Sequence, residues 1–104
     1  MKYIIGNRQS GVTTDLILEA NKFGSAILVP TDVSKDFIKH KCDELGIKCP
    51  DIFSVGDILR RSIDYNKYTN FVVNDINMIL CFALRELGMR GTIDTCGVSL
   101  DSYK

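Results

Sequence analysis

The chain has 104 residues, of which 45% are hydrophobic and 25% are charged, a mixture that predicts one compact domain over residues 1–104 and excludes a disordered chain. The formal net charge is +0, and Lys and Arg are scattered without a basic run, so we expect no direct binding of nucleic acid. The apolar start, MKYIIGN, is too short for a signal peptide, and no segment approaches a membrane span, so we expect a cytoplasmic protein.

Short apolar segments alternate with helical periodicities along the whole chain. We expect strands at 2–5, 25–30, 70–74 and 92–98, and a short strand or an extended loop at 51–55. We expect helices at 13–23, at 32–45, in a short segment opening at Asp57, and at 76–88, with glycines at the ends of the three longer ones. This alternation predicts an α/β fold, a small and mostly parallel sheet with helices on both faces.

The apolar residues of the first two helices predict which faces are buried. In the first helix the buried face comprises Leu16, Ile17, Ala20 and Phe23. The second helix begins at an N-cap formed by Thr31 or Asp32, and its buried stripe comprises Val33, Phe37, Ile38, Cys42 and Leu45. Its acidic residues are expected on the solvent side rather than in an acid site; these are Asp32, Asp36, Asp43 and Glu44.

Four cysteines lie without CxxC spacing, at positions 42, 49, 81 and 96, which predicts free thiols in a reducing compartment. His40, Cys42 and Cys49 could supply three soft metal ligands. Their spacing fits no common zinc pattern and a fourth ligand is missing, so we expect no metal and a Cys that faces the core. His40 is the only histidine and has no orienting partner in sequence, which excludes the usual hydrolase constellations.

The segment between the first strand and the first helix carries a motif. It reads Gly6, Asn7, Arg8, Gln9, Ser10, Gly11, Val12, Thr13 and Thr14. It resembles the phosphate-binding loop of P-loop NTPases, GxxxxGK[ST], in which backbone N–H groups, a helix N-terminus and a lysine hold the phosphates. Both glycines and the hydroxyl residue match, but Val12 stands where the lysine should be.

A second segment resembles the strand of AAA+ and related ATPases that ends in Asp-Glu. It runs from Phe71 to Asp75, with Asn74 at the position of the magnesium-supporting Asp and Asp75 at the Glu position. With the register shifted by one, Asp75 is the magnesium Asp and Ile76 replaces the Glu. The resemblance implies a degenerate P-loop-like domain of the RecA or AAA+ core type, without ATP hydrolysis and without a cofactor. A generic flavodoxin-like sandwich is the alternative fold.

The predicted helix 76–88 contains a run of consecutive apolar residues, from Met78 to Leu84, which places apolar side chains on every side of the helix. We expect one side of it to meet a protein partner or a second copy of the chain, unless the helix is central and squeezed between the sheet and the final strand. The polar loop before it contains two tyrosines, a residue type that is enriched at protein interfaces. The candidate interface therefore comprises Tyr65, Tyr68, Met78, Phe82 and Met89.

Three functions remain open: an inactive P-loop-like domain that binds a protein, a small nucleotide-binding ATPase or switch with a variant loop, and a nucleic-acid-binding module. In length and in its Asn-, Ile- and Lys-rich usage the chain resembles the small staphylococcal phage inhibitors of a bacterial helicase loader, an AAA+ ATPase. That resemblance implies a protein in the host cytoplasm that binds the loader, blocks its self-assembly and ATPase activity, and so inhibits host DNA replication.

Overall fold

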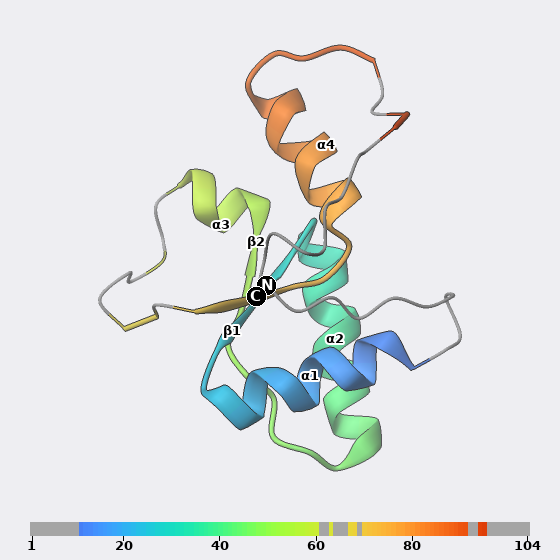
Figure 1. The fold of residues 1–104 in the computed structure, drawn as a ribbon, viewed down its shortest axis with the longest axis vertical. Coiled ribbons are helices and arrows are strands. Elements are labelled where there is room, and N and C mark those ends of the chain that lie inside the picture. The colour runs from blue at the N-terminus through green and yellow to red at the C-terminus, as the bar shows by residue number, and fades with distance from the viewer. Residues whose placement is uncertain (1–10, 61–62, 64–66, 69, 92–93, 96–104) are drawn as a thin grey trace, which may run out of the picture.

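A three-stranded parallel sheet forms the centre of the molecule (Figure 1). The computed structural model describes residues 11–60, 63, 67–68, 70–91 and 94–95. Its strands are β1 (Ala26–Val29), β2 (Ile52–Ser54) and β3 (Phe71–Val73), in the order β2-β1-β3. Ile27 pairs with Ile52 on one side and with Val72 on the other. The predicted α/β fold is therefore confirmed in its coarse form, a small parallel sheet with helices.

Within the described residues, four helices accompany the sheet: α1 (Val12–Phe23), α2 (Asp32–Leu45), α3 (Val55–Leu59) and α4 (Ile76–Glu86). The bounds of α1 and α2 match the predictions closely because their ends are locally encoded. Thr31 caps α2 by accepting a hydrogen bond from the Ser34 N–H at 3.2 Å. Gly24 and Gly46 end the two helices in the left-handed conformation, each with a φ of 63°.

The core lies between the sheet and the pair α1 and α2. Helix α1 packs against β1 and β3, and α2 packs against β1 and β2. The core residues are almost fully buried; they are Ile17, Ala20, Ile27, Val29, Ile38, Cys42 and Ile52. The predicted burial of Ile17, Ala20, Ile38 and Cys42 is thus confirmed.

Four other residues of the predicted faces are exposed, so those predictions are wrong: Phe23, Val33, Phe37 and Leu45. Phe37 precedes the buried Ile38 by one residue and points roughly 100° away from it around the helix. Among the described strands, α2 packs against β1 and β2 only, and these apolar positions of the helix remain in solvent. The acidic residues of α2 are exposed, as expected.

Helix α3 begins at Val55 rather than at Asp57, because Ser54 provides the N-cap. The Ser54 side chain accepts from the Asp57 N–H at 3.2 Å, and the Asp57 carboxylate accepts from the Ser54 N–H at 2.8 Å. The Asp57 carboxylate also forms an ion pair with the Lys35 ammonium of α2, at 2.7 Å. The reciprocal capping box fixes the start of α3, and the ion pair connects α3 to α2.

Helix α4 ends at Glu86, and Leu87 and Gly88 follow it rather than belonging to it. None of its residues is buried, so the interpretation of a central helix is wrong. The predicted strand 2–5 lies outside the described residues. Most of 92–98 does too, and Asp94 and Thr95 are in no strand. In the described part of the chain, no helix has the length and apolarity needed to cross a membrane.

Candidate functional site

The two sequence motifs are described only in part. Gly6 to Ser10 lie outside the described residues, so the geometry begins at Gly11. Gly11 is the N-cap of α1 and has a φ of 84°, a conformation that glycine adopts without strain. Val12 and Thr13 are half-buried in the first turn of the helix. The lysine position of the resembled loop is therefore occupied by a half-buried apolar side chain.

The second motif follows β3 directly. The Asn74 N–H donates to the Leu28 carbonyl at 2.9 Å, so its backbone extends the pairing of β3 with β1. Asp75 is the only described residue other than glycine with a positive φ, 63°. Its carboxylate caps α4 by accepting from the Met78 N–H at 3.4 Å. In the structure, Asp75 is thus the N-cap residue of α4.

Tyr68 is half-buried and packs on the face of the sheet opposite α1 and α2. Its ring lies 5.7 Å from that of Phe53 and 6.3 Å from that of Phe71, between ring centroids. The Lys67 ammonium sits 5.2 Å from the centre of the same ring. Tyr68 was predicted as an exposed interface residue, but much of its ring surface contacts Phe53, Phe71 and Lys67 of the same chain. Tyr65 lies outside the described residues.

Helix α4 and Leu87, the residue that caps its C-terminal end, present an exposed apolar stripe. Ile76, Leu80 and Leu87 are exposed by 55%, 41% and 76%. At roughly 100° per residue they point in nearly the same direction, together with the half-buried Ala83. We call these four residues the α4 stripe; it contains no charged side chain.

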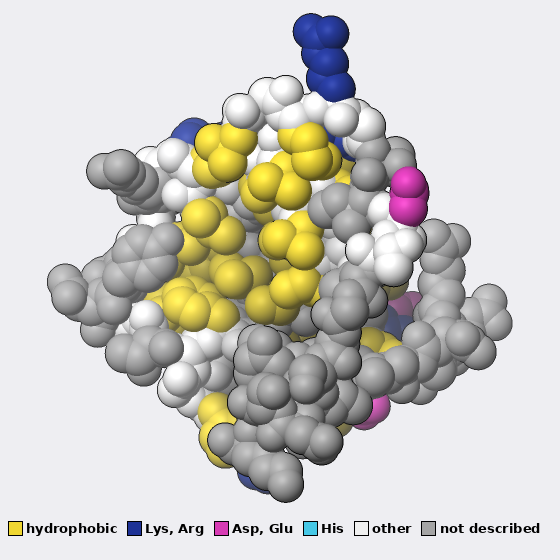
Figure 2. Space-filling model, turned by 45° about the horizontal axis from the view of Figure 1, so that its top comes forward, with side chains coloured by type: hydrophobic (Ala, Val, Ile, Leu, Met, Phe, Trp, Pro, Cys, Tyr) yellow, Lys and Arg dark blue, Asp and Glu magenta, His cyan; other side chains and the backbone are white. Residues whose placement is uncertain are grey.

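The other predicted interface residues of this region lie off the stripe. Met78 is 40% exposed and points away from it around the helix, while Phe82 and Met89 are half-buried. Phe82 contacts the Arg85 guanidinium at 5.8 Å from its ring centre. Figure 2, which brings the α4 end of the molecule forward, shows hydrophobic side chains gathered in one broad area of this face. The sequence indicated an apolar helix here, and the structure identifies the exposed stripe on it.

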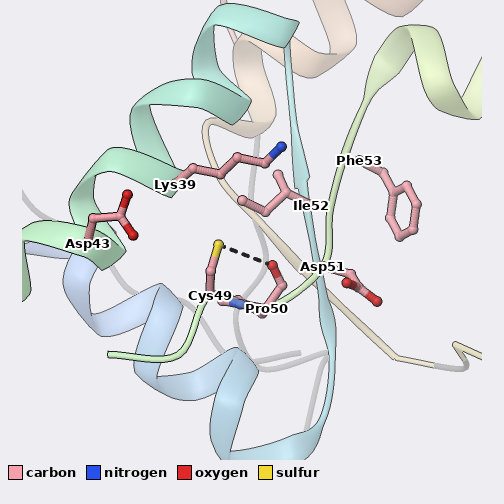
Figure 3. Close-up of a pocket in the computed structure, with 7 residues that line it drawn as sticks. All are labelled: Lys39, Asp43, Cys49, Pro50, Asp51, Ile52 and Phe53. Atoms are coloured by element: carbon pink, nitrogen blue, oxygen red, sulfur yellow. Dashed lines mark hydrogen bonds between the residues drawn. The ribbon is translucent and has the colours of Figure 1, made fainter. Parts of the chain in front are cut away.

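A pocket of about 640 Å³ opens between α2 and β2, and nothing in the sequence indicated it (Figure 3). Its polar lining comes from Lys39 and Asp43 on α2 and from Cys49 and Asp51 in the loop before β2. Pro50, Ile52 and Phe53 complete the wall. No three metal-ligating side chains of the described residues come together, so His40, Cys42 and Cys49 do not converge as a ligand set there.

Comparison of the chain with protein-family models, with curated proteins and with solved structures found no match.

Proposed function

We propose that this chain is a non-catalytic protein-binding module that docks through the α4 stripe. The observation that carries the proposal is a helix with no buried residue whose exposed side, together with the Leu87 that follows the helix, has three large apolar residues and no charge. Apolar residues spaced by about one, two and three helical turns are the usual anchors when a helix lies in a partner's groove. An exposed apolar surface of this kind is costly in water unless something covers it.

A non-catalytic role is supported by the chemistry at the two motifs. Phosphoryl transfer depends on positive charge at the terminal phosphates and on a group that positions the attacking water. Val12 supplies no charge, and the Asp75 carboxylate is engaged in capping α4. We expect no ATP turnover above a blank without enzyme. Turnover that Thr13→Ala abolishes would refute this part of the proposal.

The partner we propose is the AAA+ ATPase domain of a bacterial helicase loader. The support is the resemblance in length and residue usage to phage inhibitors of such loaders, together with the α/β layout of the chain. AAA+ subunits pack side by side, so a look-alike of one subunit could occupy the neighbour's surface without completing the shared site. An interface of roughly 800 Å² per partner is of standard size for a stable complex.

The test is size-exclusion chromatography with light scattering on a mixture of this protein and the loader ATPase domain. We expect a stoichiometric complex that needs no nucleotide and that lowers the loader's self-association and ATPase activity. Leu80→Glu places a charge in the stripe and should weaken binding at least tenfold, since burying an unpaired charge is costly. Asn77→Glu is the matched control, because Asn77 is exposed on the same helix but off the stripe.

The outcomes separate the parts of the proposal. If no complex forms well above micromolar concentration, the loader is not the partner. If the protein alone has the mass of a dimer and Leu80→Glu makes it a monomer, the stripe binds a second copy of the chain. If Leu80→Glu and Asn77→Glu behave alike in both assays, the stripe is not the binding surface.

The second candidate is a nucleotide-binding switch, favoured by the positive φ of Gly11 and by the absence of a side-chain cap for α1 among the described residues. Helix N-termini of this kind attract phosphate groups. Titration with ATP and magnesium, followed by calorimetry, distinguishes the candidates. Binding that Thr13→Ala weakens would favour the switch.

A further inference from the structure

Strand β2 forms one edge of the described sheet, and its middle residue turns its backbone away from β1. The sheet order is β2-β1-β3, so within the described residues β2 has a paired strand on one side only. The Ile27 N–H donates to the Asp51 carbonyl at 2.9 Å, and Ile27 lies opposite Ile52 in the parallel register. Since neighbouring residues of a strand direct their backbone groups to opposite sides, the N–H and the carbonyl of Ile52 point to the edge. The next outward group, the Ser54 N–H, already donates to the Asp57 carboxylate at 2.8 Å, so Ile52 is where an added strand would pair.

The pocket between α2 and β2 adjoins this residue and offers charges of both signs. In Figure 3, Lys39 and Asp43 extend from α2, and Ile52 of β2 lies across from them. Neither Lys39 nor Asp43 takes part in any of the ion pairs among the described residues. The third charged residue of the lining, Asp51, pairs with Lys67 at 3.6 Å. One cationic and one anionic side chain of the lining are therefore left to pair with a ligand.

The spacing of these two charges suits an extended peptide. Asp43 follows Lys39 by four residues, so the two side chains lie on one face of α2, about 6 Å apart along its axis. Alternate side chains of an extended chain point to the same side and are about 6.6 Å apart. Helix α2 connects the parallel strands β1 and β2, so it runs back along them. A chain added beside β2 would therefore bring two alternate side chains to the two charges.

We propose that an extended peptide segment of a partner protein adds to the edge of β2 and carries side chains of opposite charge two residues apart. Its backbone exchanges hydrogen bonds with the N–H and the carbonyl of Ile52. Its basic side chain pairs with Asp43, and its acidic side chain pairs with Lys39. In this mode of recognition the main-chain bonds supply affinity and the alternate side chains supply specificity. The site shares no residue with the α4 stripe, so its test is independent of the docking proposed for that stripe.

The probes are capped heptapeptides of Thr and Val that contain one Lys and one Glu. In two of them the charges occupy the third and fifth positions, in either order, because a parallel and an antiparallel strand present them in opposite orders. In the control peptide they occupy the third and fourth positions and so point to opposite sides of the strand. Binding to the full chain is measured by NMR titration. We expect one of the two alternating peptides to bind about fivefold more tightly than the control, because the control loses one of the two ion pairs.

Hydrogen exchange of single backbone amides tests the added strand directly. At saturation with the tighter peptide, exchange of the Ile52 amide should slow at least tenfold, because its N–H gains an acceptor. The Phe53 amide is the internal control: it faces β1 in the parallel ladder, so its exchange should change much less. Unchanged exchange of Ile52 would overturn the proposal, and so would the lack of binding by either alternating peptide at millimolar concentration.

A charge swap on α2 tests the roles of the two side chains. Lys39→Glu combined with Asp43→Lys reverses both charges at exposed positions, and should reverse the preference between the two alternating peptides. Lys41→Glu combined with Glu44→Lys makes the same exchange on α2 outside the pocket lining, and should leave the preference as it was. A preference that survives the first swap, or equal binding of the control peptide, would refute the reading of charge. If a swapped protein does not fold, the exchange of Ile52 in the unsubstituted protein decides.

Discussion

Acid should weaken the connection between α2 and α3 through a single carboxylate, Asp57. Its side chain is only 13% exposed and accepts from Lys35 at 2.7 Å and from the Ser54 N–H at 2.8 Å. A third contact, to Arg60 at 3.0 Å, involves a side chain that is 64% exposed and adds little. The Lys35 hydrogen bond, followed by that of the Ser54 N–H, lowers the pKa of Asp57 well below its ordinary value.

The magnitude follows from these contacts. Losing a capping hydrogen bond costs about 1 kcal/mol, and losing a half-buried ion pair costs about 1 kcal/mol more. Asp57→Ala should therefore lower the free energy of unfolding by about 2 kcal/mol. Asp57→Asn keeps an acceptor for the Ser54 N–H but loses the charge, so it should cost about half as much.

The sign of the pH dependence is fixed by the lowered pKa. In the unfolded chain the carboxyl has a pKa of about 3.9, so on acidification the unfolded state takes up the proton first. The contribution of Asp57 is present in full above about pH 5 and is lost as the pH falls through the unfolded and then the folded pKa.

Urea unfolding followed by circular dichroism at about pH 7 and about pH 3 measures this loss, with the Asp57→Asn variant as control. The stability difference between the two proteins should shrink in acid. A difference that stays the same at both pH values would refute the role given to the Asp57 charge. Lys35→Met, alone and combined with Asp57→Asn, isolates the ion pair, and the two changes should be clearly non-additive.

Three further predictions concern stability and use the same urea assay. Ile27→Ala removes a side chain that is 0% exposed at the centre of the sheet, and should cost about 3 kcal/mol; a loss below about 1 kcal/mol would mean that the core is loosely packed. Gly46→Ala places a Cβ at a φ of 63° with open space around it, so it should lower the free energy of unfolding by about 1 kcal/mol through backbone strain alone. Unchanged stability would contradict the left-handed end of α2. Asp75→Asn should be nearly neutral because Asn also caps helices and tolerates a positive φ, whereas Asp75→Ala should cost about 2 kcal/mol; equal effects would mean that Asp75 does not act as a cap.

Much of the local structure could be predicted from the sequence, because its causes lie within a few residues. Thr31 and Gly46 bound α2 through contacts made inside one turn of the chain, so both ends were predicted to within a residue. The apolar runs at 26–29 and 71–73 predicted β1 and β3 because a strand buried in a parallel sheet needs side chains of that kind on both faces. The unusual backbone of Gly11 and Asp75 falls within the motifs that the sequence singled out.

Burial and proximity were decided only by the tertiary structure. Phe23, Val33 and Phe37 are as apolar as their buried neighbours, but the structure leaves them exposed. The apolar run in α4 could not reveal which of its residues stay in solvent, since that depends on what packs against the helix. The pocket beside Cys49 arises where α2, the loop after it and β2 meet. No residue spacing encodes that meeting, because it depends on how a helix end, a loop and a strand are placed together in space.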